Sequence, residues 1–576
     1  MAEREFSPAW FEGEPPAKSF RSILKWGDPR AFKHPNRRLY RLMKETFGLD
    51  DEYFRHPFET GMETVPESRP CALEARHVEA LRSIVGAENV FTDVYRRLGV
   101  AYGKTMLDAM RLRKGIIENI PDAVLHPRSR ADLRAVVDYC AANGIPVYVY
   151  GGGSSVTRGV EAVKGGVTLD MRVHLNKVLA FDEKNHTITV EAGMSGPELE
   201  RQLRNAAALH GAKRAYTCGH LPQSFEYSAV GGWVTTRGSG QNSSYYGNAA
   251  DMVIAQDYVC PACDIRTGEF PAAANGPDVD EIMMGSEGAF GVLYSATLRF
   301  RMYMPENTRR YSYIFPSWEE AKEAAREIMQ GEFGHPSVFR LSDPEESDVA
   351  LKLYGVEGTV LDTLMRLRGF RKGERCLMLG TADGEAGFSR HVARMVGRVA
   401  RRHGAMSTTG LVQRHWEEGR FRDPYMREDL QDYGIMMDTL ECSVNWSNLE
   451  TVHTGVREFC HSRPDTICMT HMSHFYPQGC NLYFIFIAKI DRIDEYLAYQ
   501  SGILDSIQKH GATMSHHHGI GKAFAPWLEG DVGPEAISLF RAIKRHLDPK
   551  GIMNPGGTIA LDLPDEKRRI LRKPGR

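Results

Sequence analysis

The sequence predicts an α+β protein made of several packed units, in which a sheet-rich stretch precedes a mixed stretch of helices and strands. One observation is the length of 576 residues, because about 100–200 residues per domain correspond to three or four units. The other is a change of pattern near residue 117, where short β-branched runs broken by glycine begin to alternate with helices that have recognisable caps.

Residues 1–116 are rich in Arg, Pro and aromatic side chains, and helical apolar spacing recurs near 78–84 and 102–117. We therefore predict an N-terminal helical extension. Residues 117–304 form the sheet-rich unit, which begins with a strand, the helix ADLRAVVDYCAANG, the strand IPVYVY and the loop GGGSSVTRG.

Two capping patterns predict helix starts further along the chain. Ser195 and Glu198 have capping-box spacing before ELERQLRNAA, and Ser317 and Glu320 have it before EEAKEAAREIMQ. The second helix opens a mixed α/β unit.

We predict that residues 305–505 form this unit as a cap domain. Residues 506–576 form a C-terminal segment that returns to the sheet-rich unit and carries the run SHHHGIGK. Its tail is basic and would attract an anionic membrane surface, although a solvated tail explains it as well. The basic residues are Lys567, Arg568, Arg569, Arg572 and Lys573.

Composition limits the classes of function. Hydrophobic residues make up 42% of the chain and charged residues 25%, which is typical of globular proteins with large cores. Lys plus Arg total 72 and Asp plus Glu total 74, so a net charge of -2 gives no indication of a nucleic-acid partner. An ionic substrate therefore requires a local cluster of charges.

The chain has no apolar run of about 18 residues, so we expect no membrane span. The start MAEREFSPAW has charges where a signal peptide has an apolar core, and we expect a cytoplasmic protein with peripheral membrane contact at most. The close cysteine pair Cys260 and Cys263 has no second pair nearby to complete a zinc site. We interpret it as an ordinary loop.

Glycine loops follow several predicted strands. The first, at 151–155, lacks the Lys-Ser/Thr of a Walker loop and the GxGxxG spacing, and by itself it is equally consistent with a plain turn. The second, at 223–229, leads into VGGWVTTRGSG, where Arg237 could flank an anionic ligand. The third is EGAFGVL at 287–293. Three such loops in order indicate a long cofactor bound across one domain.

The strings VYGGGSSV, GHLPQSFEYSAVGGWVTTRGSG, GSEGAFGVL and SHHHGIGK resemble the vanillyl-alcohol-oxidase (PCMH-type) flavoproteins. Within that superfamily they are most similar to the alkyldihydroxyacetonephosphate synthases, from about residue 100 to 560. The resemblance implies a PCMH-type FAD-binding domain and noncovalent FAD, since the first loop lacks the flavin-tethering His of several relatives. The FAD-binding residues that it implies are Val149, Tyr150, Gly151, Gly152, Gly153, Ser154, Ser155, Gln223, Ser224, Phe225, Glu226, Tyr227, Ser228, Ala229, Thr236, Arg237, Gly238, Ser239, Glu287, Gly288, Ala289, Phe290, Gly291, Val292 and Leu293.

Chemistry-bearing residues outside these loops each have a simpler interpretation. Adjacent histidines are poorly spaced as metal ligands but suit a phosphate-binding acid–base loop, and an exposed His-rich turn is the alternative. Tyr483 lies on a strand opposite Leu482 and Phe484 and could be a core tyrosine, while Arg427 could be a solvated helix arginine. The resemblance implies that Arg427 binds the substrate phosphate and that the catalytic residues are Tyr483, His516, His517, His518 and Arg340.

The reaction implied by the resemblance exchanges the acyl chain of 1-acyl dihydroxyacetone phosphate for a fatty alcohol, in a homodimer. Tyr483 takes a proton from the carbon that bears the ester, the acid leaves, and the flavin holds the carbon fragment until the alcohol displaces it.

An alternative is an FAD-dependent dehydrogenase or oxidase of a 2-hydroxy acid or alcohol. Such relatives often carry a metal-binding HxGDGNxH, and here HFYPQGCNLY has Tyr483 in place of the second His, so we predict no metal. A third class, a flavin-bearing structural subunit, requires Tyr483 and the His run to lie far from the cofactor loops.

Overall fold

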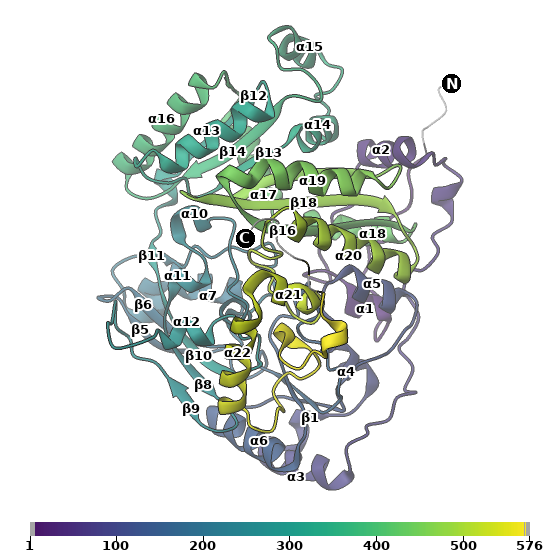
Figure 1. The fold of residues 1–576 in the computed structure, drawn as a ribbon, viewed down its shortest axis with the longest axis vertical. Helices are drawn as coiled ribbons and strands as arrows, with labels where there is room; N and C mark the ends of the chain where they lie inside the picture. The colour runs from purple at the N-terminus through teal and green to yellow at the C-terminus, as the bar shows by residue number, and fades with distance from the viewer. Residues whose placement is uncertain (1–5, 570, 572–576) are drawn as a thin grey trace.

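The computed structural model describes residues 6–569 and 571. Figure 1 shows a cap at the top, two smaller sheets below it, and the C-terminal segment running between them. The tail residues Arg572 and Lys573 lie outside the described residues. Within the described part of the chain, none of the helices combines the length and the apolar character that crossing a membrane requires.

The first sheet is parallel at its centre and is covered by α6 (Arg130–Asn143), on which α3 (Ala75–Val85) packs. Ser129 caps α6, and Gly144 ends it in the left-handed conformation. The edge strand comes from before residue 117, so the segment predicted as an extension also supplies part of this sheet. In sheet order the strands are β1 (Val90–Phe91), β2 (Ala123–Leu125), β4 (Val167–Asp170) and β3 (Val147–Tyr150).

The second sheet is antiparallel, and the turn after β8 holds Cys260 and Cys263 in an ordinary loop, as predicted. Helix α7 (Gly196–Arg204) begins after Ser195, but the Ser195 side chain makes no capping hydrogen bond. The backbone of Ser195 instead bridges to Ala229. In sheet order the strands are β5 (Val178–Asp182), β6 (Thr187–Glu191), β10 (Val292–Arg299), β8 (Val253–Val259) and β9 (Asp264–Arg266).

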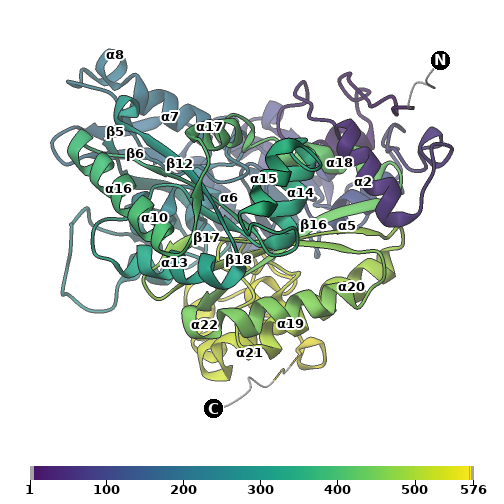
Figure 2. The same cartoon turned by 90° about the horizontal axis from the view of Figure 1, so that it is seen from above.

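The cap is a seven-stranded antiparallel sheet. One face is covered by α13 (Trp318–Gln330), α16 (Ala386–Arg402) and α19 (Leu449–His461), as Figure 2 shows from above. The other face turns toward the first lobe, flanked by α14 (Pro344–Leu353) and α17 (Gly410–Gly419). In sheet order the strands are β15 (Met406–Ser407), β12 (Arg309–Phe315), β14 (Cys376–Ala382), β13 (Phe339–Ser342), β17 (Ile467–Tyr476), β18 (Gly479–Lys489) and β16 (Ile435–Asn445).

The N-terminal segment is helical, as predicted. Helix α2 (Arg37–Phe47) packs its apolar side chains against the end of the cap near α18 (Met426–Gln431). The predicted helix at 102–117 is the shorter α5 (Met106–Arg113). Arg21 of α1 (Phe20–Leu24) and Arg113 of α5 both pair with Asp432, and this joins the segment to the cap.

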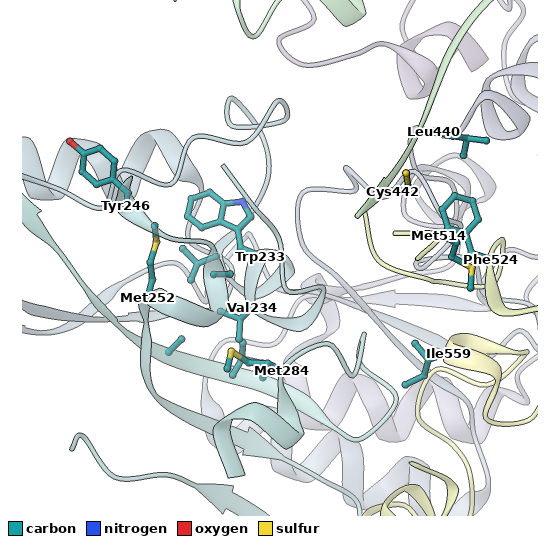
Figure 3. Packing of buried hydrophobic residues seen from close by; sticks show 14 of the residues in the cluster. Trp233, Val234, Tyr246, Met252, Met284, Leu440, Cys442, Met514, Phe524 and Ile559 are labelled. Atoms are coloured by element: carbon teal, nitrogen blue, oxygen red, sulfur yellow. The ribbon is translucent and has the colours of Figure 1, made fainter. Parts of the chain in front are cut away.

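The C-terminal segment carries α21 (Ala525–Val532) and α22 (Pro534–Leu547), and the chain after them contacts the first sheet. The N–H of Val147 on β3 donates to the carbonyl of Ile552, and the N–H of Asn554 donates back to Val147, both at 2.8 Å. Figure 3 shows one group of buried side chains around Trp233 and another where Met514 and Phe524 meet the cap sheet.

Candidate functional site

A cavity of ≈ 920 Å³ lies between the first lobe and the cap. All three glycine loops reach it, and so do the catalytic tyrosine, both arginines and two of the three histidines predicted from the sequence. The predicted residues that line it are Val149, Gly151, Gly152, Gly153, Ser154, Ser155, Gln223, Ser224, Ala229, Thr236, Gly238, Ser239, Glu287, Gly288, Gly291, Leu293, Arg340, Arg427, Tyr483, His517 and His518.

The other predicted residues lie behind this lining. Arg237, expected beside an anionic ligand, has a positive φ of 54° and instead forms a partly exposed ion pair of 2.6 Å with Glu281. The turn around Arg237 therefore brings backbone to the cavity and its side chain to the surface. The remaining residues of this group are Tyr150, Phe225, Glu226, Tyr227, Ser228, Ala289, Phe290, Val292 and His516.

The first two glycine loops contact each other through their backbones. A Cβ at Gly152 would overlap the carbonyl oxygen of Tyr227, and Gly153 has a positive φ of 68° beneath the hydroxyl of Tyr150. Only glycine fits both positions. Gly232 lines the cavity with no atom within 4 Å of an added Cβ, so open space remains there for a ligand.

The third loop holds the histidine segment. The half-buried carboxylate of Glu287 accepts the N–H groups of Ile520 and Gly521 at 2.7 and 2.8 Å. Burial raises the pKa of Glu287 to about 6, although these two bonds act in the other direction. The sequence predicts Glu287 as a cofactor contact, and the structure shows that its carboxylate is used to fix the loop after His518.

The cap holds the same segment through Glu441, which the sequence analysis missed. On β16, its carboxylate accepts the N–H groups of His516, His517 and His518 at 2.8–3.1 Å, and the amide of Asn481 at 2.6 Å. Burial would raise the pKa of Glu441, but the histidines and these bonds bring it below its ordinary value. The available signal was a glutamate at a buried position of the strand IMMDTLECSV, which also carries Asp438.

Glu441, His517 and His518 also place one possible metal-ligand atom each within 4.8 Å of one another. Both carboxylate oxygens of Glu441 already accept hydrogen bonds from the loop and from Asn481. A carboxylate has about four lone-pair sites, and these bonds occupy them. We therefore interpret the cluster as a loop anchor.

The imidazoles of the loop are held neutral. Burial lowers the pKa of His517 well below its ordinary value, and the neighbouring histidines lower it further. The Nε2 atom of His516 lies 2.8 Å from the hydroxyl of Tyr476, outside the cavity. Nδ1 of His474 lies 3.1 and 2.8 Å from the hydroxyls of Ser239 and Ser243, which joins the cap to the second glycine loop.

Tyr483 faces the cavity, while Leu482 and Phe484 are fully buried on the opposite side of β18, as the alternation predicts. Its hydroxyl donates to Thr439 Oγ1 at 3.1 Å. Burial raises the pKa of Tyr483 to about 12. In the sheet register Glu441 on β16 is directly opposite Tyr483.

Arg427 lines the cavity from α18, which packs on β16 of the cap. It donates to the carbonyl of Lys104 at 2.6 Å, and its guanidinium lies 5.0 Å from the ring centre of Trp26. Across residues 6–569, no carboxylate lies within ion-pair distance of Arg427. Its charge is therefore available to an anionic ligand. Arg340, in contrast, is paired with Glu346 at 2.5 Å.

His220 fits a bound cofactor. It is buried against the cavity, and neither ring nitrogen has a partner among the described side chains and backbone. Burial lowers its pKa to about 3. A neutral imidazole with unused nitrogens, open space at Gly232 and hydroxyls at Ser154 and Thr236 suit a large ligand with phosphate and heterocyclic groups.

Two family models match the chain. The FAD binding domain matches residues 121–268, and the C-terminal domain of FAD linked oxidases matches residues 304–558. Together they span most of the sequence. FAD is therefore the cofactor of this chain.

Individual proteins are similar over most of the length. The alkyldihydroxyacetonephosphate synthase of Dictyostelium discoideum is 29% identical over 83% of this chain and 80% of its own length. The uncharacterized FAD-linked oxidoreductase YgcU of Escherichia coli K12 is also 29% identical, over 83% of this chain and 97% of its own. A solved alkyldihydroxyacetonephosphate synthase superposes with a TM-score of 0.77 at 25% identity, covering 93% of this chain and 97% of that one.

Proposed function

This chain belongs to the FAD-linked oxidase superfamily, and on that premise we propose that it is an alkyldihydroxyacetonephosphate synthase of ether-lipid synthesis. The reaction replaces the acyl chain of 1-acyl dihydroxyacetone phosphate with a fatty alcohol. One observation carries the proposal: a single cavity is lined both by Arg427, which has no carboxylate within ion-pair distance among residues 6–569, and by a group of apolar side chains, here called the apolar arm. The arm is lined by Val349, Leu353, Leu377, Leu379, Val412, Trp416, Met469 and Ile485.

The two ends suit the two parts of the substrates. Arg427 presents a planar fork of N–H donors, which binds phosphate in a bidentate manner. His517 and His518 also line the cavity and add neutral imidazoles that can hydrogen-bond an anion. The apolar arm stabilises an aliphatic chain at roughly 0.8 kcal/mol per buried CH₂ group.

Tyr483 is positioned between these ends and would take the proton from the carbon that bears the ester. Its hydroxyl donates to Thr439 Oγ1, which orients the phenol oxygen, and the phenol must first lose its own proton for this oxygen to accept the proton of the carbon. When bound, FAD supplies an electron sink beside the reacting carbon. Exclusion of water by the buried cavity prevents simple hydrolysis of the ester.

The decisive experiment is incubation with acyl dihydroxyacetone phosphate and labelled hexadecanol, followed by lipid analysis. The expected product is a labelled alkyl ether together with one equivalent of fatty acid. Free fatty acid without ether would contradict the proposal. A yellow protein that releases its FAD on acid precipitation supports noncovalent binding, and flavin retained on the denatured chain contradicts it.

A dehydrogenase or oxidase is the second candidate, favoured by the similarity to the oxidoreductase of Escherichia coli. Lasting bleaching of the flavin spectrum by a 2-hydroxy acid or an alcohol would support it. A purely structural flavoprotein would require Tyr483 and the histidines to lie far from the glycine loops, whereas His517 and Tyr483 line the same cavity as these loops.

We also propose that the protein contacts membranes peripherally and that it forms a homodimer. In the tail, Arg568 pairs with Glu529 and Arg569 with Asp505, so these charges are already used. Helix α15 (Val360–Leu367) supports membrane contact better, because Val360 is 78% and Leu367 80% exposed. Its Met365 packs on the residues that line the apolar arm. The dimer is tested by light scattering after gel filtration.

A further inference from the structure

Three polar side chains of the cap are linked to one another and have no role in the mechanism proposed above. Arg340 on β13 pairs with Glu346 of α14 at 2.5 Å, and Oε1 of Glu346 lies 3.2 Å from Nδ1 of His471 on β17. All three residues line the cavity. The sequence analysis named Arg340 alone, because the other two come from segments far apart in the chain.

The negative charge of Glu346 determines which ring nitrogen of His471 carries the proton. Burial opposes ionisation of Glu346, but Arg340 and His471 lower its pKa to about 2, so the carboxylate is charged. A carboxylate only accepts hydrogen bonds, and Nδ1 of His471 must therefore carry the proton that it donates. Burial also lowers the pKa of His471, which keeps the imidazole neutral. The Nε2 atom is left as a free base.

Nε2 of His471 has no hydrogen-bond partner anywhere in residues 6–569. His471 and Tyr483 are direct partners in the register of β17 and β18, and their rings stack at 5.0 Å and 24°. Stacking excludes a hydrogen bond between the two side chains, so each presents its own polar atom to the cavity.

This pair lies at the boundary between the two ends of the cavity. Two residues along the strands, on the same face, Met469 and Ile485 line the apolar arm. In the other direction Ser473 and His474 line the polar end. An alkyl chain that fills the arm therefore brings its terminal hydroxyl to His471 and Tyr483.

We propose that His471 is a catalytic base of this site and takes the hydroxyl proton of the fatty alcohol. This inference rests on the proposed function. The O–H bond of the alcohol breaks, its proton moves to Nε2, and the oxygen electron pair forms the C–O bond of the ether. Over the whole exchange, the C–O bond to the carboxylate breaks with its electron pair leaving on the carboxylate, and the ether C–O bond replaces it. The proton that Tyr483 removed returns to the same carbon, and the proton on Nε2 passes to solvent, where it balances the carboxylate released earlier. Glu346 is a positioning residue that fixes the tautomer of His471.

The test separates the two halves of the reaction in the FAD-loaded protein. Fatty-acid release is measured in a single turnover without alcohol, and ether formation is measured with hexadecanol. In His471→Gln the amide still donates to Glu346 but offers no base. We expect ether formation to slow about 100-fold, with acid release and the KM for alcohol within about threefold of wild type.

The matched control is His453→Gln. His453 is buried and lies 3.3 Å from Asp343, but it is outside the cavity lining. It should leave both half-reactions unchanged. If His471→Gln slows both halves equally, or neither, the inference is wrong. If wild type releases no fatty acid at all, the proposed function itself is wrong.

A second variant tests the same inference if His471→Gln fails to fold. Glu346→Gln keeps the size of the side chain and removes the charge, and we expect about 10-fold slower ether formation with native acid release and flavin spectrum. Its control is Glu345→Gln in the same helix, where Glu345 pairs with Arg457 away from the cavity. Equal behaviour of the two variants would overturn the role of Glu346, and with it the assignment of His471 as a base.

Discussion

The two walls of the cavity are built in different ways. The cap wall consists of side chains from neighbouring strands in register, with His471, Tyr483 and Glu441 in one row. The first-lobe wall consists of glycine loops that present backbone and hydroxyls. A rigid sheet fixes reacting groups more closely than loops do, and loops bring more backbone to a large ligand. Damage to the cap should therefore impair chemistry while the flavin stays bound.

The largest expected effect is that of Tyr483→Phe, which removes one hydroxyl from the cap wall. We expect turnover to fall about 10²–10⁴-fold, because a general acid–base group contributes that much. FAD content and thermal stability should stay native, as measured by flavin absorbance and melting. Tyr499→Phe is the control, since the Tyr499 hydroxyl bonds the Cys460 carbonyl inside the core. A loss under about threefold for Tyr483→Phe would refute its role.

Arg427→Lys tests phosphate binding, and its expected effect is smaller than that of Tyr483→Phe. It keeps the charge and loses the planar fork, so affinity for the phosphorylated substrate should fall roughly 10-fold to 150-fold, or about 1.5–3 kcal/mol. The measurement compares the acyl phosphate with its dephosphorylated analogue in both proteins. The wild-type preference for the phosphate should largely disappear in the variant, and an equal loss for both compounds would contradict phosphate binding.

Glu287 and Glu441 hold the same histidine loop from opposite walls, and their effects on stability should respond to pH in opposite directions. The pKa of Glu287 is raised from 4.5 to about 6, so its stabilising effect is full below pH 4.5 and is lost as pH rises through 6. That loss is about 2 kcal/mol. The pKa of Glu441 is lowered, so its contribution is present above 4.5 and is lost as pH falls through the folded value.

Thermal melting of Glu287→Gln and Glu441→Gln between pH 4 and 7 checks this contrast. Wild type should lose stability relative to Glu287→Gln as pH rises from 4.5 to 7. Relative to Glu441→Gln it should stay nearly constant from pH 4.5 to 7 and lose stability as pH falls below 4.5. Parallel pH profiles for the two variants would show that the two anchors do not differ in this way.

The remaining prediction lies outside the cavity and concerns membrane contact rather than the chemistry of the two walls. Replacing Val360 and Leu367 by Glu should weaken the free energy of binding to phospholipid vesicles, because each exposed apolar side chain contributes roughly 1–2 kcal/mol. Co-sedimentation with the vesicles measures this loss. Leu539→Glu is the control, because Leu539 is 59% exposed on α22. If deleting residues 565–576 reduces binding more than the α15 variant does, the tail is the contact instead.

Local patterns predicted the parts of the site that depend on one segment. Alternation along β18 placed Tyr483 opposite Leu482, and the glycine loops reached the cavity as expected. Partners from distant segments were not predictable in this way. No local sequence pattern marks Glu441, His471 or Lys104. Each contributes to the site through a hydrogen bond to a residue many positions away in the sequence. The side chain of Arg237 points to the surface because the residue has a positive φ. The sequence does not predict a positive φ at a position that is not glycine.

The return of the chain to its first sheet has a consequence for biosynthesis. Asn554, which pairs with Val147, also donates its side-chain amide to the carbonyl of Glu287 at 2.6 Å and to Gly159 at 3.2 Å. The last tenth of the polypeptide thus joins the first and third glycine loops. A ribosome must release nearly the whole chain before these loops are tied together, because domains complete only when all their strands have emerged. We therefore expect flavin capture to follow the synthesis of nearly the whole chain, and a truncation before Asn554 to weaken cofactor binding along with loss of the tail.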